Sequence, residues 1–497
     1  MKKDLVVPIE EQEYYSLTHK QLGKGMMFLL REKCLDKNYN KEIGSFNIYR
    51  ERNFDYINYS TLKDAFNILL SRHEALRTKF ISINGEVKQK VMPIELLSSS
   101  VVSYDFSGLE DAESAAKLIK KKLIETNFDF FEDLPIQIGL IKIRNDQYII
   151  ILIVNHVASD FYSLVLLENE LKEIYGSLER DGSPTMIDNA IQIKDYAAWE
   201  NAKVRGSDNQ FSLFWEKKLA SKPPINLLKS HKKIILPTIN NDDSYANSMK
   251  REMEDKFWHI EGSEIDSVLG VVHRASTLPG ASYRFTIDGK VYSDLKMTSI
   301  QTRTTTFTVL ISSFLLLLNK LSGENDVIVG IETVIRNEEL KNVVGWLSNT
   351  MFYRKELDSN IRIDEFINEI GNEILEHYEY RCYPIEKILL DRDISLDAIG
   401  ALYLNYVNHL DEKDIKARES EKIHHQGGLP YFDLDWFLDE YTNGIEINLR
   451  YRRDLFEQAQ IESVVQLFFE VLEFMLRHQK KLLRDLENSL SDTQVNC

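Results

Sequence analysis

The 497-residue chain is long enough for two or three domains of ordinary size, or for one large unit of two lobes. Its 61 Lys and Arg against 78 Asp and Glu leave a net charge of −17, which argues against binding to nucleic acid or to anionic membrane surfaces. With 43% hydrophobic residues, 21 Gly and 10 Pro, the composition excludes a mainly disordered or linker-dominated protein.

The cysteines and the apolar segments bear on the compartment. Cys34, Cys382 and Cys497 have no CxxC spacing, which predicts neither a disulfide framework nor a zinc site. The N-terminus lacks the apolar segment of a signal peptide. The longest apolar stretch, residues 307–318, is shorter than the roughly 20 residues that a membrane-spanning helix needs. We therefore expect a soluble, cytoplasmic protein with no membrane segment and no bound metal.

The first half of the chain alternates helical and strand patterns. Residues 59–72 have the apolar spacing of a helix, which either Ser60 or Thr61 is placed to cap. Residues 136–140 alternate as a half-buried strand does, and residues 148–154 (YIIILIV) are apolar at nearly every position, which is typical of a strand buried on both faces. A second amphipathic helix is predicted for residues 161–175.

The second half continues this alternation after a polar interval. Residues 308–321 predict a buried helix, residues 327–334 a buried strand, and residues 460–478 a closing amphipathic helix. Residues 240–302 are polar and poorly periodic, so we interpret them as a hairpin-containing insertion or a mobile loop region. The pattern predicts an α/β protein with at least two sheet-forming regions.

The most informative local motif is NHVASD, residues 155–160, which stands where a buried strand ends and a helix begins. Ligands bind at the carboxyl ends of central strands in α/β proteins, because the loops there are open and helix N-termini point inward. His156 can act as a base near neutral pH, and Asp160 can cap the helix or pair with a cation. In the structural interpretation, which position alone slightly favours, His156 is a satisfied half-buried histidine and Asp160 only an N-cap.

Other motifs indicate less. In RHEALRTKF, residues 72–80, Glu74 and Arg77 are placed for an internal ion pair, and we interpret the segment as structural. The sequence contains no GxxxxGK[ST] or GxGxxG phosphate-binding loop and no GxSxG nucleophile elbow. His424 and His425 are interpreted as loop residues, because adjacent side chains do not converge on one metal. We expect no cofactor bound by the chain itself.

Six segments, taken in order, resemble the condensation domains of nonribosomal peptide synthetases, members of the chloramphenicol-acetyltransferase-like superfamily. The segments, each with its family pattern, are RHEALRTKF at 72–80 (RHExLRTxF), NHVASDF at 155–161 (HHxxxDG), KDYAAW at 194–199 (YxDFAxW), VGWLSNTMFYR at 344–354 (VGxFVNTxxxR), YRCYPIEKIL at 380–389 (HQDYPFE) and LDRDIS at 390–395 (RDxSRNPL). Their order and approximate spacing fit the family over almost the whole chain.

The resemblance implies an α/β fold of two chloramphenicol-acetyltransferase-like lobes, set as a V-shaped pseudo-dimer with a tunnel between them. We place the N-terminal lobe at residues 1–180 and the C-terminal lobe at residues 181–497, with 240–302 as an irregular insertion. In the family, donor and acceptor enter the tunnel from opposite faces on the phosphopantetheine arms of carrier proteins. The acceptor's amine attacks the donor's thioester and forms an amide.

The resemblance also implies the site residues. His156 matches the active histidine of the family motif, which serves as general base or positions the amine. Asp160 matches a structural aspartate that pairs with an arginine, and Arg336 lies where we expect that arginine; their fork would hold the loop rigid. The candidates for lining the tunnel are Ser159, Trp346 and Asn349.

Two positions depart from the family motif. Asn155 replaces the first histidine, which in the family is largely architectural, so activity need not be lost. Phe161 replaces a glycine that leaves space beside the active histidine. Its ring either narrows the tunnel or points into the core of the lobe.

These departures leave three functions open. The first is an amide-forming condensation enzyme, an acyltransferase; the second is a catalytically silent platform that binds carrier proteins or tailoring enzymes; the third is an ester-forming O-acyltransferase. The chain has no carrier motif of the LGGxS kind and no adenylation signature. We therefore expect a monomer, free-standing or excised from a larger synthetase, that meets carrier proteins in trans or takes a small soluble amine as acceptor.

Overall fold

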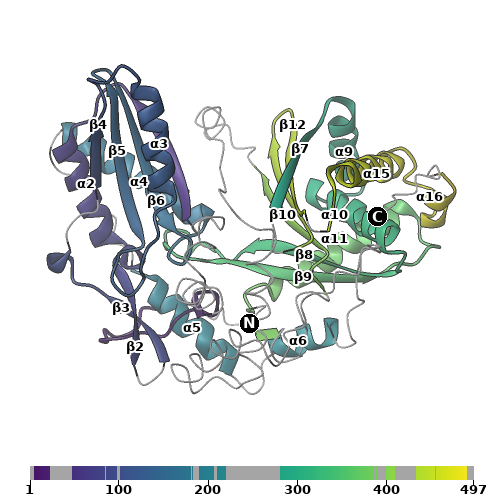
Figure 1. Ribbon diagram of the computed structural model, residues 1–497. Helices are drawn as coiled ribbons and strands as arrows, with labels where there is room; N and C mark the ends of the chain where they lie inside the picture. Colours follow the sequence, from purple (N-terminus) through teal and green to yellow (C-terminus); the bar gives the residue numbers. More distant parts are fainter. Residues whose placement is uncertain are drawn as a thin grey trace, which may run out of the picture.

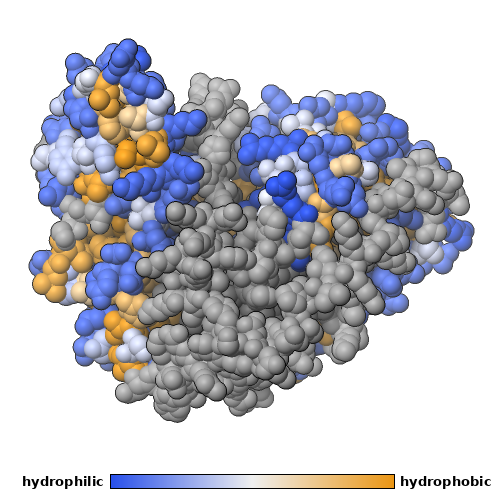
Figure 2. All heavy atoms as spheres, in the orientation of Figure 1, coloured by the Kyte–Doolittle hydropathy of each residue, from blue (hydrophilic) through white to orange (hydrophobic). Residues whose placement is uncertain are grey.

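The computed structural model describes residues 5–22, 47–83, 86–97, 101–180, 182, 190–205, 210–219, 280–384, 387–388, 399–408, 432–453 and 455–489. Figure 1 shows two bodies, each a β-sheet with helices packed on it: the first holds β1 and β4–β6, the second β7–β12. The predicted α/β class with two sheets is confirmed. On the face seen in Figure 2, hydrophobic residues gather mainly on the first body.

The first sheet has the strand order β1-β6-β5-β4. Its strands are β1 (Asn47–Phe54), β4 (Val101–Asp105), β5 (Ile136–Arg144) and β6 (Gln147–Asn155). The central strand β6 runs antiparallel to both of its neighbours and is buried from residue 149 to residue 155, as its continuous apolar sequence predicts. The helices α2 (Tyr59–Arg72), α3 (Ala112–Ile124) and α4 (Phe161–Arg180) cover this sheet.

The helix α2 confirms the predicted range but not the predicted cap. Its apolar residues are buried, whereas the N-cap is Asn58, whose side chain accepts from the backbone N–H groups of Ser60 and Thr61. The two predicted caps therefore lie one and two residues inside the helix. Asn, Ser and Thr are all good N-caps, so the local sequence did not separate them.

The second sheet has the strand order β7-β12-β11-β10-β8-β9. The strands are β7 (Gly280–Asp288), β8 (Asp326–Val334), β9 (Ser348–Glu356), β10 (Leu402–Asn408), β11 (Leu434–Tyr441) and β12 (Gly444–Arg452). The helices that pack on it or beside it are α9 (Gly289–Gln301), α10 (Thr306–Ser322), α11 (Ile363–Glu379) and α15 (Gln458–Arg477). The predicted buried strand and the two predicted helices of this half are confirmed.

Part of the predicted irregular region is regular. Residues 240–279 lie outside the described residues, but β7 pairs with β12 along its whole length and α9 follows directly. The reading of residues 280–302 as an insertion or loop was therefore wrong. Since β7 is an edge strand with alternating exposed positions, it carries the polar residues that hid its pattern.

The most buried helix is α10. Nearly all of its side chains are buried, Thr305 caps its N-terminus, and Gly323 ends it with a φ of 73°. Within the described residues, no single helix is long and apolar enough to cross a membrane. Only α9 and α10 taken together reach that length, and they meet at a bend of 106°.

The two hydrophobic cores do not follow the order of the chain. The second core is built from residues between Trp215 and Leu486, whereas the first reaches past residue 180 to Ile193 and Tyr196 of α5 (Ile193–Arg205). The first core also takes residues from the connection between β8 and β9, namely Ile335, Leu340, Val343, Val344 and Leu347. The lobe boundary at 180/181 remains a prediction, but the packing of the first core depends on this later segment.

The remaining described elements are short. They are η3 (Glu74–Arg77), η4 (Ile94–Leu96), the hairpin β2 (Thr78–Ile83) and β3 (Glu86–Val91), α6 (Gln210–Lys218) and α16 (Leu483–Ser489). The β2–β3 hairpin forms a separate two-stranded sheet. It follows η3 directly, so the RHEALRTKF segment runs from the end of α2 into this hairpin.

Candidate functional site

The loop that follows β6 begins at a buried asparagine. The Asn155 side-chain oxygen accepts from the backbone N–H of Val157 at 3.0 Å, and its amide donates to the side-chain oxygen of Asn47 at 3.0 Å. Asn47 in turn donates to the carbonyls of Ile124 and Thr126 at 3.0 and 2.7 Å. The side-chain amide of Asn155 thus holds the loop against β1, and Asn47 extends this connection to the end of α3.

The loop ends at a buried ion pair. Arg336 Nη2 lies 2.7 Å from Asp160 Oδ1, and both side chains are at most 5% exposed. Asp160 Oδ1 also accepts from the Ser163 N–H at 2.8 Å, and Oδ2 accepts from the Leu347 N–H at 3.0 Å. Arg336 Nη1 donates to two carbonyls of the segment between β8 and β9. The expected pairing of Asp160 with an arginine is therefore present, with charge-assisted bonds on both sides.

A residue that the sequence did not indicate lies at the centre of these bonds. The Ser163 hydroxyl is within hydrogen-bond distance of Asp160 Oδ1 at 2.8 Å, of Arg336 Nη2 at 2.6 Å, and of the Gly345 N–H and carbonyl at 3.1 and 2.9 Å. Ser163 is fully buried. The available signal was its spacing of three residues from Asp160, which places it within reach of the N-cap carboxylate.

His156 differs from its neighbours in exposure. Within the loop 155–160 it alone is half-buried, while the other five residues are buried. Its ring lies against the indole of Trp346, with centroids 4.3 Å apart and planes at 43°. Trp346 is 4% exposed, and its Nε1 donates to Ser348 Oγ at 3.0 Å. The geometry therefore presents an imidazole at the carboxyl end of a central strand, on a loop fixed at both ends.

Three further predicted site residues, Ser159, Asn349 and Phe161, do not contact His156 in the way that Trp346 does. Ser159 is fully buried and donates to the Asp160 carbonyl at 3.1 Å. Asn349 is 2% exposed and donates to the carbonyls of Arg381 and Tyr383, both at 2.8 Å. Backbone carbonyls thus accept the hydrogen bonds of Ser159 and Asn349, and the lining of a tunnel by these two residues and Trp346 stays a prediction. Phe161 is half-buried and is not among the described residues that pack against either core.

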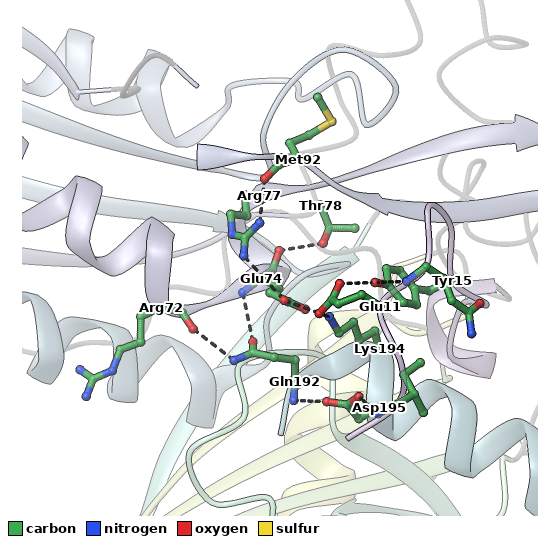
Figure 3. Close-up of polar contacts among 12 residues, drawn as sticks. Glu11, Tyr15, Arg72, Glu74, Arg77, Thr78, Met92, Gln192, Lys194 and Asp195 are labelled. Atoms are coloured by element: carbon green, nitrogen blue, oxygen red, sulfur yellow. Dashed lines mark hydrogen bonds and ion pairs between the residues drawn. The ribbon is translucent and has the colours of Figure 1, made fainter. Parts of the chain in front are cut away.

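A second polar cluster joins two of the sequence motifs, RHEALRTKF and KDYAAW (Figure 3). Glu74 of RHEALRTKF forms the expected ion pair with Arg77 at 3.6 Å and lies 3.0 Å from Lys194 Nζ of KDYAAW. Lys194 also bonds Glu11 at 2.7 Å, and the ammonium lies 4.9 Å from the Tyr15 ring centre. These contacts fasten the N-terminal residues 9–21 to the first body.

Burial sets the charges of this cluster. It raises the pKa of Glu74, although the bond to Lys194 opposes the rise. Burial also disfavours the charged form of Lys194, but its bonds to Glu11 and Glu74 outweigh that cost and raise its pKa. Lys194 therefore keeps its charge and holds two carboxylates together. These contacts agree with the structural interpretation of the RHEALRTKF segment.

Metal binding finds no support in the described residues, where no three His, Cys, Asp or Glu side chains come together as ligands. His424 and His425 lie outside the described residues, as does LDRDIS at 390–395. The YRCYPIEKIL segment is described only in part.

The site can now be compared with known proteins. The family described as "Condensation domain" matches residues 11–257 and again residues 238–495. The chain belongs to the condensation-domain family. The two matches together span nearly the whole chain, and each carries one of the two sheets. The expected family of nonribosomal peptide synthetase condensation domains is thereby confirmed.

Relatives in sequence are large synthetases. Gramicidin S synthase 2 of Brevibacillus brevis is 25% identical over 97% of this chain, and bacitracin synthase 3 of Bacillus licheniformis is 25% identical over 99%. This condensation domain spans only 10% and 7% of those proteins. The chain thus corresponds to about a tenth or less of the length of these relatives.

Relatives in structure cover the whole fold. The X-domain in its complex with OxyB from teicoplanin biosynthesis aligns with a TM-score of 0.71 at 19% identity, covering 99% of this chain and all of that one. The starter condensation domain of rhizomide synthetase aligns with a TM-score of 0.66 at 12% identity, covering 96% and 97%. At these identities the likeness establishes the fold of the condensation domain alone.

Proposed function

We propose that this condensation domain joins an acyl, aminoacyl or peptidyl group, carried as a thioester on the phosphopantetheine arm of a carrier protein, to an amine. The amine nitrogen bonds to the thioester carbonyl carbon, the carbon–sulfur bond breaks, and the thiol leaves on the arm. The nitrogen gives up one proton. The observation that carries this proposal is the half-buried imidazole of His156 on a loop that Asn155 and Asp160 fix at both ends.

His156 assists the amine, and the surrounding residues hold it in place. A positioned imidazole either accepts the proton as the new bond forms or orients the nitrogen by a hydrogen bond. The Asp160 carboxylate keeps the loop rigid through its bonds to Arg336 and to the backbone N–H groups of Ser163 and Leu347. The carrier proteins act in trans, one as donor and a second as acceptor, unless a small amine takes the acceptor's place.

The test supplies a carrier loaded with an acyl donor and a panel of free and carrier-bound amines, with alcohols added to detect ester formation. His156→Ala should lower the rate by about 10²- to 10⁴-fold. His156→Gln keeps a hydrogen-bonding group but cannot accept the proton, so it separates the two roles. His478→Ala is the matched control, since His478 is also half-buried but follows α15 in the second body. Full activity in His156→Ala would refute the role of His156.

A second candidate function rests on Phe161. Its ring stands where the family motif has glycine, and neither described core takes it up. A ring in that place favours a platform that binds carrier proteins or tailoring enzymes without turnover. In that case loaded carriers bind but no product forms over the whole panel.

The two functions are separated by changing the ring. If Phe161 obstructs one arm, Phe161→Ala gives or raises activity, whereas Phe161→Leu, which keeps most of the volume, does not. If wild type already turns over and Phe161→Ala changes little, the platform interpretation is wrong and the amide-forming proposal stands.

A further inference from the structure

The indole of Trp346 packs against the imidazole of His156, with ring centroids 4.3 Å apart. We propose that Trp346 is a positioning residue that sets the orientation of the His156 imidazole, and that Ser163 holds Trp346 in place for this purpose. The inference rests on the proposed function of His156. It assigns a role to two side chains that do not have to touch either substrate.

The contact is too close to leave the imidazole free to turn. With ring centroids 4.3 Å apart, the two rings are in van der Waals contact, and the tilt of 43° brings one edge of the imidazole toward the indole. The indole therefore restricts rotation of the His156 ring toward the side that it occupies. Because a packed wall removes rotamers, Trp346 restricts where the two ring nitrogens can point.

The wall itself is fixed. Trp346 Nε1 donates to Ser348 Oγ at 3.0 Å, and the side chain is only 4% exposed. The residue before it, Gly345, is bonded through both its N–H and its carbonyl to the Ser163 hydroxyl. The residue after it, Leu347, donates its N–H to Asp160 Oδ2 at 3.0 Å. The backbone on each side of Trp346 is therefore attached to the first turn of α4.

These bonds form a closed circuit with the histidine loop. The chain runs from His156 to Asp160 and Ser163, hydrogen bonds cross from those two residues to the backbone around Trp346, and the indole returns to the imidazole. The loop and the indole thus belong to one connected set of contacts. A site held in this way is pre-organised, which is where enzymes gain rate from orientation.

Ordinary core packing does not account for the pair. The other described histidine with a tryptophan neighbour, His377, is 1% exposed and packs among several rings of the second core, with Trp215 at 5.7 Å. His156 is half-buried and has its tryptophan closer, at 4.3 Å. An indole that shields one side of an accessible imidazole and leaves another open orients it rather than buries it.

The experiment compares Trp346→Leu and Trp346→Phe in the condensation assay, with kcat and KM measured separately across pH. Trp346→Leu should lower kcat by about 10- to 100-fold with little change in the KM of the donor. Trp346→Phe keeps a ring against the imidazole and should recover part of the loss. Ser163→Ala, which frees the backbone beside the indole, should lower kcat in the same direction but less.

The control and the second readout make the outcome decisive. Trp436→Phe and Trp436→Leu alter a buried tryptophan of the second core and should leave kcat unchanged. Ring ¹⁵N shifts of His156, recorded by NMR without substrate, should change in Trp346→Phe and in Trp346→Leu. This readout does not require activity, so it tests the inference even if His156→Ala is fully active and the proposed function fails.

Two results would overturn the inference. One is a Trp346→Leu protein with the kcat and pH profile of wild type. The other is a set of His156 ring signals that is the same in wild type and in Trp346→Phe, which also decides the matter if the leucine variant does not fold.

Discussion

Asp160 and Arg336 are 176 residues apart in the sequence and form an ion pair of 2.7 Å with almost no exposure to solvent. The pair joins the start of α4 to the connection between β8 and β9. A buried pair of this kind adds little over a hydrophobic contact of equal size, but the loss of one partner leaves an uncompensated charge. The contribution of the pair to stability is therefore best measured with substitutions of one partner at a time.

The first prediction concerns that pair. Arg336→Met leaves the Asp160 carboxylate buried without its cation, which should lower the free energy of unfolding by about 3–5 kcal/mol. Urea unfolding followed by fluorescence measures the change. The matched control is Lys341→Met, because Lys341 and Glu338 form an exposed pair in the same segment, and the midpoint should hardly move. Equal midpoints for both variants would contradict the prediction.

The second prediction concerns Gly345. A Cβ added there would lie 2.4 Å from Cδ1, 2.8 Å from Cγ1 and 3.2 Å from Cβ of Ile193, a buried residue of α5. Because these three atoms include Cβ, which a change of rotamer cannot move away, Gly345→Ala should cost about 1–3 kcal/mol of stability.

A double-mutant cycle checks that reason. Ile193→Ala alone leaves a cavity and should destabilise by about 2–5 kcal/mol. Combined with Gly345→Ala, the loss should be clearly smaller than the sum of the two single losses, since the new methyl group enters the space that the isoleucine leaves. Strict additivity in chemical unfolding would show that the clash does not exist.

The third prediction concerns the attachment of residues 9–21. Lys194→Met leaves the half-buried Glu74 with only the more distant Arg77, at 3.6 Å, as its cation, and it breaks the bond to Glu11. This N-terminal segment should therefore be held less firmly. Limited proteolysis or hydrogen exchange of residues 9–21 reports it, and we expect faster cleavage and exchange. Glu11→Gln removes only the partner whose side chain is 81% exposed and should have a much smaller effect. Wild-type protection in Lys194→Met would be the contrary result.

The fourth prediction concerns pH. Burial among Phe214, Trp215 and Tyr353 lowers the pKa of His377 from 6.5 to about 4, although the bond to the Glu373 carbonyl opposes the change. The unfolded chain therefore takes up this proton at higher pH than the folded chain does. The stability from the neutral ring is fully present above about pH 6.5 and is lost as pH falls toward 4, by about 3 kcal/mol in all.

Replacing the histidine tests that assignment. His377→Phe keeps a ring in the cluster but has no proton to take up, so its unfolding free energy should fall less steeply between pH 6.5 and pH 4 than that of wild type. His478→Ala, at a half-buried position, serves as the control and should keep the wild-type slope. Parallel curves for wild type and His377→Phe would assign the slope to other groups.

Most of the fold could be predicted from segments with strong apolar patterns. The strand β6 and the helix α10 each contain a long apolar run and are buried at nearly every position, so their sequences had few alternatives. The edge strand β7 has only one buried residue in nine, and its polar composition was read as a loop. The apolar pattern of a segment depends on what the segment packs against, so edge strands have the weakest pattern.

The residues of the candidate site also differ in how far the sequence predicted them. The resemblance to a family brought His156, Asp160 and Arg336 together from distant segments, because a motif carries information on tertiary position. The resemblance did not predict which polar side chains form hydrogen bonds with the backbone. Ser159 and Asn349 donate their side-chain hydrogen bonds to backbone carbonyls. Ser163, a helix residue that no motif indicated, contacts four groups: the Asp160 carboxylate, the Arg336 guanidinium, and the N–H and carbonyl of Gly345. Which partners a polar side chain finds for its hydrogen bonds depends on the fold and cannot be predicted from the residue type.

The connection between β8 and β9 has a consequence for chimeric proteins. Five of its apolar residues belong to the first core. Its Arg336 and Trp346 contact Asp160 and His156, which belong to the other half of the chain. A chimera that exchanged halves near residue 180 would combine a histidine loop from one parent with the residues that hold it from another. To keep a native set of partners, residues 335–347 have to be transplanted together with the N-terminal half.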